Sequence, residues 1–329
     1  MFASLRAHLS GLIDYAGLFP PAALPLEAAL RNYVQYRSEP EAWMLGRFIC
    51  PVARLEELAL LVRELAPSGP PLALSVLAGK GDSLAETYHS LNNELKAVVA
   101  FQASHDARLK VEALEIRLPA AALPGDKPDL TGGFFLMAGE LIESQVRDFV
   151  TPFFEVPLGA GWRERVPRVL DGLALATLGG GIKGQIFCHP GGVKLRCGGL
   201  EASAFPSPEQ VAFVITQCRE RAIALKATAG LHHPMRRFDP GLRTHMHGFI
   251  NVFGAAVLAH ARKLSEEQVR QVVEDEDPTH FVFDDDGFRC NDFHATTAEV
   301  AAAREHAAVS FGSCSFDEPR DDLRALGWL

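Results

Sequence analysis

Short apolar runs alternate with longer segments of helical period along most of the chain. The runs that read as strands are GRFICPV (46–52), PLALSVLA (71–78), EALEIRLP (112–119), PFFEVPL (152–158), GVKLRCGG (192–199), IALKATAGL (223–231) and AVSFGSCSF (308–316). Strands that alternate with helices predict a parallel sheet covered by helices. These seven units, with GFINVF (248–253) as a candidate eighth strand, predict an α/β fold of the closed (β/α)8 TIM-barrel type. A doubly wound open sheet is the alternative, but no GxGxxG motif opens the first unit.

Four segments fall outside this regular alternation. We expect one TIM-barrel-like domain over residues 1–329, with an N-terminal helical cap over 1–45. An inserted β-hairpin is predicted over 279–292, where THFVFDDDGFRCND carries a turn at Asp285–Gly287. GQIFCHP (184–190) is a further strand candidate. DYAGLFPP (14–21) is rich in Gly and Pro, so it reads as a rim loop over a pocket or as a packed entry to the first helix.

Charged residues interrupt four of the predicted strands. Successive side chains of a strand point to opposite faces, and in a barrel the uniformly apolar face packs on the helices. The charged positions are therefore expected to point inward: Glu115, Arg117, Glu155, Lys194, Arg196 and Lys226. They lie near the carboxyl ends of their strands, where active sites of such barrels are found. The alternative for each is a structural ion pair or a strand end in solvent.

The sign of these charges indicates the kind of ligand. Four are basic and two are acidic, so the set sums to +2. An interior with excess positive charge favours a small anionic substrate, and arginine binds carboxylate or phosphate through two parallel hydrogen bonds.

Two of the charges are lysines on consecutive predicted strands. If Lys194 and Lys226 face one pocket, their repulsion and their desolvation lower the pKa of at least one of them. A neutral lysine amine attacks a carbonyl and forms a Schiff base. Chemistry of this kind would explain why an apolar strand such as ALKATAGL carries a lysine.

The order VKLRCGG, a helix beginning FPSPEQVAF, and ALKATAGL resembles class I aldolases of the deoxyribose-phosphate aldolase type over residues 193–258. The resemblance implies that Lys194 is the Schiff-base lysine and Lys226 the second lysine that tunes it. Arg196 stands where the family has a small hydroxyl residue, and LHHPMRR replaces its glycine-rich phosphate loop. Glu115 or Glu155 would substitute for the family's catalytic aspartate only by analogy.

Histidines gather after the Lys226 strand, namely His232, His233, His245 and His247, with His189 upstream. Each can serve as a general acid or base, as a metal ligand, or as a loop residue that bonds the backbone. At most one of the adjacent pair His232 and His233 is expected to enter the pocket. An alternative divalent-metal site would use Glu115, Glu155, His232 and His247. Cys314 is expected to be a small core residue, because no adjacent base is evident.

Composition narrows the setting. The net charge of −9 and the absence of a lysine- or arginine-rich run argue against nucleic acid as a partner. No apolar run is long enough to span a membrane. Six cysteines without a CxxC pair read as reduced thiols, so a cytoplasmic location is expected. The sequence does not decide the oligomeric state, and a homo-oligomer is one of the alternatives.

Three functions are consistent with these patterns. The first is a lyase without a cofactor that uses a lysine Schiff base. Its catalytic residues would be Lys194, Lys226, Glu155 and His232, and its substrate-binding residues Glu115, Arg117, Arg196, Thr228, Gly198 and Gly199. The second is a divalent-metal-dependent isomerase, hydrolase or lyase. The third is a non-catalytic barrel that binds an acidic metabolite.

Overall fold

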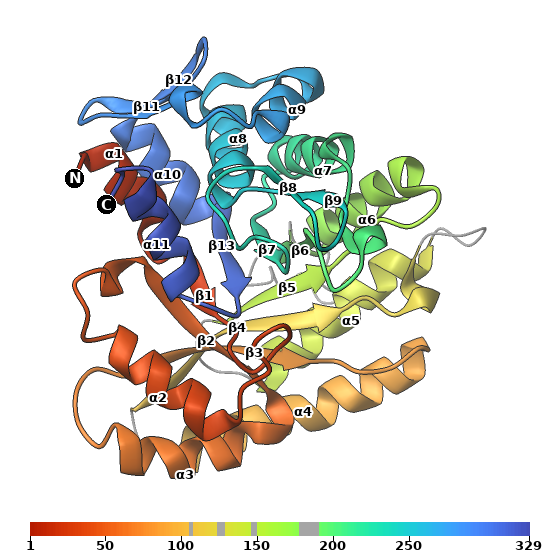
Figure 1. Cartoon of the computed structure of the whole chain (residues 1–329). Helices are drawn as coiled ribbons and strands as arrows, with labels where there is room; N and C mark the ends of the chain where they lie inside the picture. Colours follow the sequence, from red (N-terminus) through yellow and green to blue (C-terminus); the bar gives the residue numbers. More distant parts are fainter. Residues whose placement is uncertain (105–107, 124–128, 146–149, 178–190) are drawn as a thin grey trace. The chain divides into compact units, whose positions relative to one another are not determined.

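Eight strands close into a barrel in the order β1-β13-β7-β6-β5-β4-β3-β2 (Figure 1). The structure is a computed structural model that describes residues 1–104, 108–123, 129–145, 150–177 and 191–329. The barrel strands are β1 (Ile13–Tyr15), β2 (Leu45–Pro51), β3 (Leu72–Ala78), β4 (Leu109–Arg117), β5 (Thr151–Glu155), β6 (Gly192–Arg196), β7 (Leu225–Thr228) and β13 (Ala308–Ser313). Helices alternate with them, so the TIM-barrel prediction is confirmed.

The helices that follow or precede these strands have the lengths of ordinary globular helices. They are α1 (Ala3–Leu9), α2 (Leu26–Tyr36), α3 (Leu55–Leu65), α4 (Leu84–Ser104), α5 (Asp129–Gln145), α6 (Trp162–Thr177), α7 (Pro208–Glu220), α8 (Phe249–Arg262), α9 (Glu266–Glu274), α10 (Thr297–His306) and α11 (Asp317–Ala325). The local sequence determines where several of these helices begin. Helices α7, α9 and α10 each begin with a reciprocal capping box, for example Ser207 with Gln210.

One strand prediction was wrong, and one strand was not predicted. GFINVF is not a strand but the first turns of α8, which is buried from Phe249 to Ala259. Periodicity cannot separate a helix that is apolar all round from a buried strand. The eighth strand is instead β1, inside the segment expected to be a helical cap or rim loop, and it pairs in parallel with β13. Its three residues are too few to show an alternation.

The predicted insertion near 279–292 is present. Strands β10 (Phe281–Phe283) and β11 (Gly287–Cys290) form the hairpin, and β12 (Phe293–Thr296) adds a third antiparallel strand. A separate two-stranded sheet joins β8 (Arg237–Asp239) to β9 (Thr244–Met246). The candidate strand 184–190 lies outside the described residues.

The chain forms two compact units. The first comprises Met1–Ala23, Glu39–Gly46 and Leu195–Leu329, and the second comprises Leu24–Ser38 and Arg47–Lys194. Strands β2 to β5 and helices α2 to α6 lie in the second unit, apart from the first two residues of β2.

Helices α1, α8 and α10 build the core of the first unit. Helix α8 packs on β13, where Phe249 stacks on Phe311 with ring centroids 5.3 Å apart. Helix α1 lies against α10, close to both chain ends (Figure 1). The buried Arg304 of α10 donates hydrogen bonds to the carbonyl oxygens of His8 and Val309, each 2.7 Å away. These bonds join α1 to the start of β13, and they satisfy carbonyl groups of the backbone in the interior of the unit.

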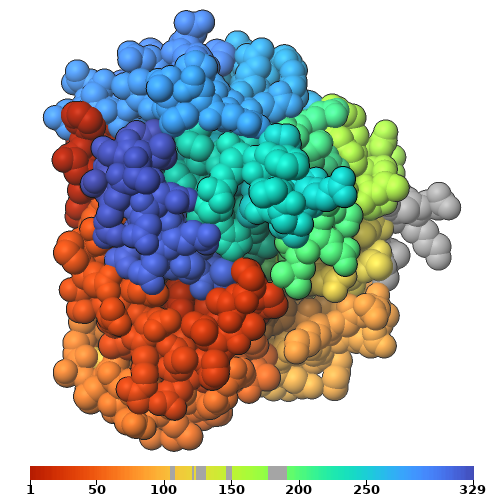
Figure 2. Space-filling view, viewed as in Figure 1, coloured from red at the N-terminus to blue at the C-terminus, as the bar shows by residue number. Residues whose placement is uncertain are grey.

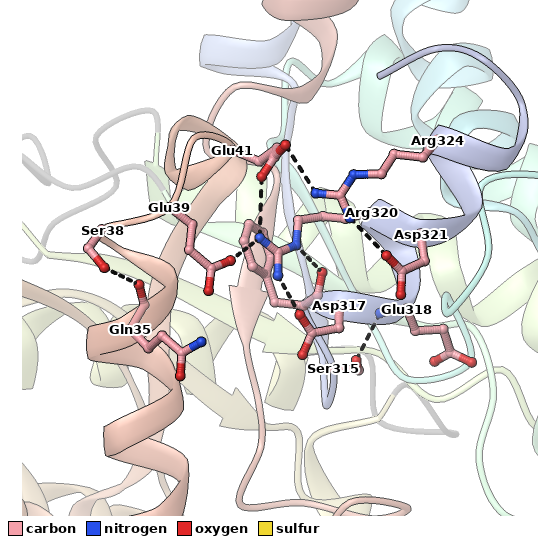
Figure 3. A network of polar contacts seen from close by, with 11 residues as sticks. Gln35, Ser38, Glu39, Glu41, Ser315, Asp317, Glu318, Arg320, Asp321 and Arg324 are labelled. Carbon is pink, nitrogen blue, oxygen red and sulfur yellow. Dashed lines mark hydrogen bonds and ion pairs between the residues drawn. The ribbon is translucent and has the colours of Figure 1, made fainter.

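Helix α11 is anchored by one arginine. The side chain of Arg320 is only 5% exposed and contacts the carboxylates of Glu39, Glu41 and Asp317 (Figure 3). Arg324 adds a second contact to Glu41 at 3.1 Å. This network joins the last helix to the segment that precedes β2, so α11 is held in place within the first unit.

Aromatic packing dominates the second unit on one side of β5. Phe154 of β5 lies edge-on to Phe135 of α5 with ring centroids 4.9 Å apart, and Phe134 is also in contact. All three rings are buried. Helices α5 and α6 pack against each other in the same unit. The apolar piece GGFFLMA (132–138) lies in α5, and its Phe134, Phe135 and Ala138 are buried.

Within the described ranges, no helix combines the length and the apolar composition that a bilayer crossing requires.

Candidate functional site

Strands β4, β5 and β6 each contribute one charged residue to a cluster in the second unit. In the parallel register, Arg117 lies beside Glu155 and Glu155 lies beside Lys194. Glu115 is two residues before Arg117, so strand alternation places it on the same face. The alternation in these strands therefore directs Glu115, Glu155 and Lys194 to one side.

The three side chains form a compact cluster. Lys194 Nζ lies 3.0 Å from Glu115 Oε2 and 2.8 Å from Glu155 Oε2. Ser75 of β3 donates a hydrogen bond to the other oxygen of Glu115 at 2.7 Å. The side chains of Glu115, Lys194 and Glu155 are 2%, 7% and 15% exposed, so Glu155 is the member most open to a ligand.

The pKa of Lys194 is raised above its ordinary value. Burial by itself lowers it, but the negative charges of Glu115 and Glu155 and their hydrogen bonds outweigh the burial. The sequence led us to expect repulsion between two lysines to lower the pKa of at least one of them. At Lys194 the shift has the opposite sign, because two carboxylates contact its ammonium.

Both predicted arginines are exposed. Arg117 and Arg196 are the last residues of β4 and β6, and each ends its strand in solvent. Without them the buried cluster of Glu115, Glu155 and Lys194 carries one positive and two negative charges, a sum of −1. The expected positive interior is therefore wrong for this cluster, because the excess came from residues that end their strands at the surface.

Lys226 lies in the first unit and has a partner that the sequence did not indicate. Its ammonium contacts the carboxylate of Asp14 on β1, and both side chains are 0% exposed. Ser310 of β13 donates a hydrogen bond to the same carboxylate oxygen at 2.7 Å. Register places Ser310 beside Lys226 and Asp14 beside Gly312, so the three share one face. Gly46 leaves room for this pair, since a Cβ there would collide with Asp14 Oδ1.

Backbone contacts join the loops after β6 and β7. A Cβ on Gly198 would lie 2.8 Å from the Cα of Gly230, which itself has φ of +70°. The carbonyl oxygen of Thr228 accepts a hydrogen bond from the amide of Cys197 at 2.8 Å. A larger residue would not fit at Gly199 either, because its Cβ would lie 2.8 Å from the Cβ of Ala204. The glycines proposed for substrate binding thus allow two loops to approach closely.

His232 and His233 both reach α11. His232 Nδ1 lies 3.2 Å from Glu318 Oε2, and His233 Nδ1 contacts Asp322. The sequence suggested that these neighbours diverge, but the turn after β7 is not extended. In the space-filling view α11 and the segment around β8 and β9 form adjoining surface of the first unit (Figure 2). Burial by itself lowers the pKa of His232, but interactions with Cys314 and Glu318 outweigh it and raise this pKa to about 9.

The remaining histidines have separate surroundings. His247 is buried and its Nε2 lies 2.7 Å from the carbonyl oxygen of Pro206, while His245 lies 3.3 Å from Glu276. Burial lowers the pKa of His247 to about 4. Among the described residues, no three His, Cys, Asp or Glu side chains are arranged to hold a metal ion. His189 lies outside the described residues.

Comparison with known proteins supports the fold. No protein-family model matches the sequence, and no curated protein matches it. A solved structure of a deoxyribose phosphate aldolase from Aeropyrum pernix, described as a unique tetramer, is similar with a TM-score of 0.51. The two chains are 12% identical, and the match covers 98% of this chain and 96% of that one. This protein shares the aldolase's barrel fold. The likeness is consistent with the resemblance in residues 193–258, and at this identity it shows the fold alone.

Sequence reasoning missed three polar residues that contact the two lysine clusters. Asp14, Ser75 and Ser310 are all buried. Asp14 had a signal, because a single carboxylate stands in the apolar run LIDY. Ser75 and Ser310 had none, since small hydroxyl residues are common in strands and only their tertiary neighbours distinguish them.

Proposed function

We propose that the protein is a lyase that cleaves or forms a carbon–carbon bond in a small anionic carbonyl compound through a Schiff base on Lys194. The observation that carries the proposal is a buried lysine held between two carboxylates near the carboxyl end of a barrel strand. The shared barrel fold of an aldolase adds support.

Accessibility favours Lys194 over Lys226 as the nucleophile. The side chain of Lys194 is 7% exposed, whereas that of Lys226 is 0% exposed and is held by Asp14 and Ser310. A carbonyl carbon must reach the amine nitrogen, so a lysine with an open side is the better nucleophile. We propose that Lys226 is not the nucleophile and that its role lies in the contacts it makes with Asp14 and Ser310 in the first unit.

The cluster allows the amine to become neutral without changing its total charge. When Lys194 passes its proton to one carboxylate, the sum of −1 is unchanged and the amine lone pair becomes free. The amine then adds to the carbonyl, and the protonated carboxylic acid returns its proton to the hydroxyl that leaves as water. The carboxylate therefore acts first as base and then as acid.

The same electrostatics that raise the pKa of Lys194 would stabilise the reaction intermediate. A protonated Schiff base is a cation that occupies the place of the ammonium, between Glu115 and Glu155. Groups that favour a cation at this position favour the iminium as well. The raised pKa is thus compatible with Schiff-base chemistry, provided a carboxylate accepts the proton.

The two carboxylates have different roles in this mechanism. Glu155 is the more exposed and is proposed to take the proton of the substrate's β-hydroxyl group as the carbon–carbon bond breaks. The bonding electrons move into the iminium and form an enamine. Glu115, held by Ser75 at 2.7 Å, is proposed to orient Lys194. Arg117 lies beside Glu155 in the register, where it can bind an anionic group of the substrate.

Borohydride trapping tests this mechanism. The protein is incubated with acetaldehyde, pyruvate or dihydroxyacetone phosphate, reduced, digested and mapped by mass spectrometry. We expect a reduced adduct on the peptide that contains Lys194, and we expect the Lys194→Ala variant to lose it. Lys226→Ala is the matched control and should keep the adduct on Lys194 if it folds, which circular dichroism reports.

Two outcomes would contradict the proposal. One is the absence of any adduct with all three compounds while the protein is folded. The other is an adduct that persists at equal yield in Lys194→Ala. Glu155→Gln should trap substrate but lose turnover, because it leaves the amine in place and removes the proposed base.

A further inference from the structure

A groove lies between α1 and α10, which pack side by side in the first unit (Figure 1). Its volume is about 530 Å³, and its polar lining residues are Arg6 and Ser10 of the α1 segment and Arg304 and Glu305 of α10. Both helices lead into the amino-terminal ends of barrel strands, β1 and β13. Active sites of such barrels lie at the carboxyl ends of the strands, so the groove is separate from the catalytic end.

Arg304 is the buried cation of the groove, with 7% of its surface exposed. Its Nε and Nη1 atoms donate to the carbonyl oxygens of His8 and Val309 at 2.7 Å, and its Nη2 atom donates to that of Ser10 at 3.3 Å. A guanidinium has five N–H groups. Within the described residues, one N–H group on each terminal nitrogen is therefore left without a protein acceptor. An oxyanion accepts such a pair through two parallel hydrogen bonds.

The charge of Arg304 is only partly balanced. No carboxylate of the described residues forms an ion pair with it, and carbonyl groups accept its hydrogen bonds without carrying a net charge. The end of a helix such as α1 offers about half a negative unit. The carboxylate of Asp14 attracts Arg304 from a distance, but it contacts Lys226. Desolvation therefore dominates and lowers the pKa of Arg304 to about 9 from 12.5, so an anion in the groove would stabilise this cation.

The other charges along the groove leave an excess of positive charge near Arg304. Arg6 adds a second guanidinium, which is exposed. Glu305 opposes the two arginines, but its side chain is 72% exposed and lies 3.6 Å from His306, so solvent weakens its effect. Asp285 accepts a hydrogen bond from the amide of Ala3 at the start of α1, which is about 10 Å from the end of this helix.

We infer that the groove between α1 and α10 is a second ligand site, in which Arg304 and Arg6 bind the phosphate group of a small phosphate monoester. The residues of this site take no part in the mechanism proposed for Lys194, and the inference does not depend on that mechanism.

Charge and shape favour a phosphate monoester over other oxyanions. Its phosphate group carries about −1.5 to −2 charges near neutral pH, so it matches two guanidinium groups better than a carboxylate does. The remaining lining residues are Ala3, Ala7 and Ala301, whose small side chains offer an apolar surface to the carbon part of a ligand. The volume of about 530 Å³ leaves room for that part and is ordinary for a site that binds a small molecule.

Isothermal titration calorimetry of the full-length protein with glycerol 3-phosphate tests the inference, at pH 7 and low salt in a buffer without phosphate. Glycerol should give no heat of binding, and glycerate should bind more weakly than glycerol 3-phosphate. The affinity should be unchanged in Arg117→Met, which removes the arginine proposed to bind anions near Lys194. Absence of binding, loss of binding in Arg117→Met, or equal affinity for glycerate would overturn the inference.

Two neighbouring alanines of α10 locate the site. Both are exposed, but Ala301 lines the groove and Ala302 does not. We expect Ala301→Glu to weaken binding by about tenfold or more, because it places bulk and negative charge in the groove, and Ala302→Glu to change it by less than about twofold. The two variants have the same net charge, so equal affinities would overturn the location.

The charges of the groove are tested one at a time. Arg6→Gln should weaken binding by about fivefold and Glu305→Gln should strengthen it by about twofold, and unchanged affinity in both would overturn their roles. Arg304→Met should abolish binding. It also removes three hydrogen bonds to the backbone, so circular dichroism must show that it is folded. Ala301→Glu leaves these bonds in place and decides the question if Arg304→Met does not fold.

Trp43 gives a second signal from the same place. The Arg6 guanidinium lies over its ring, 4.6 Å from the centroid, so glycerol 3-phosphate should change the tryptophan fluorescence. Trp43→Phe should lose this change and keep the heat of binding. Heat of binding in the unaltered protein without a change in fluorescence would place the ligand away from Arg6 and would overturn the inference.

Discussion

Replacing His8 by leucine should stabilise the protein, and most strongly in mildly acidic solution. His8 lies on α1 with its side chain fully buried against Phe283 and Phe288, whose ring centroids are 5.6 Å and 5.4 Å away. Within the described part of the chain, neither ring nitrogen has a hydrogen-bond partner. A buried polar group in this state costs about 1–3 kcal/mol. Leucine has a similar volume and no polar atom to leave unsatisfied.

The pH dependence follows from the protonation of the ring. Burial, with a smaller contribution from the charge of Arg304, lowers the pKa of His8 to about 3, against 6.5 as its ordinary value. Above pH 6.5 the ring is neutral in both folded and unfolded chains and contributes no pH dependence. As the pH falls below 6.5 only the unfolded chain binds the proton, so stability is lost down to about pH 3. Between pH 7 and pH 5 this loss is about 2 kcal/mol.

Urea denaturation followed by far-UV circular dichroism at pH 7 and pH 5 measures both effects. We expect His8→Leu to raise the free energy of unfolding by about 1–2 kcal/mol at pH 7, and by about 2 kcal/mol more at pH 5, with an unchanged m-value. His306→Leu, at a side chain 74% exposed on α10, is the matched control and should change stability by less than about 0.5 kcal/mol. A variant that is no more stable at pH 7 and shows no larger difference at pH 5 would refute the reasoning.

Three further substitutions test buried polar contacts. Lys226→Met leaves the Asp14 carboxylate buried without its cation and should lower the free energy of unfolding by about 3–5 kcal/mol. Adding Asp14→Asn should recover more than half of this loss. Losses of the two single variants that simply add in urea denaturation would contradict the prediction. Asn251→Leu breaks hydrogen bonds to Val272, Asp275 and Arg236 backbone groups at 2.7–3.0 Å, so we expect a loss of about 2–4 kcal/mol, and a loss below about 1 kcal/mol would speak against it. Arg320→Met should speed hydrogen exchange throughout α11, and unchanged exchange would show that the carboxylates around Arg320 do not hold the helix.

Local pattern was sufficient for most of the barrel. Seven of the eight strands were predicted within a few residues, because each is a short apolar run bounded by turn residues. Pattern failed at one very short strand and at one helix that has no polar face. Strand β1 has three residues, and helix α8 is apolar on every side because α7, α9, α10 and β13 pack around it.

Strand alternation also predicted which charged side chains lie on the face opposite the apolar one, because the period of two residues is a local property of the chain. It directed Glu115, Glu155 and Lys194 to one side, and their oxygen and nitrogen atoms lie 2.8–3.0 Å apart. Alternation predicts the face of a strand on which a side chain lies, but not how buried that side chain is. Arg117 and Arg196 were therefore predicted to lie inside with the buried charges, although they end their strands in solvent.

The sequence by itself therefore determined the kind of barrel and the strands that carry its lysines. Only the tertiary structure decided the partners of these lysines. Asp14 is 212 residues from Lys226, and Glu115 is 79 residues from Lys194. His232 and Glu318 are 86 residues apart and meet because they follow β7 and β13, which are neighbours in the closed barrel. The pKa of a buried group depends on such neighbours, and contacts between residues so distant in the chain leave no local pattern in the sequence.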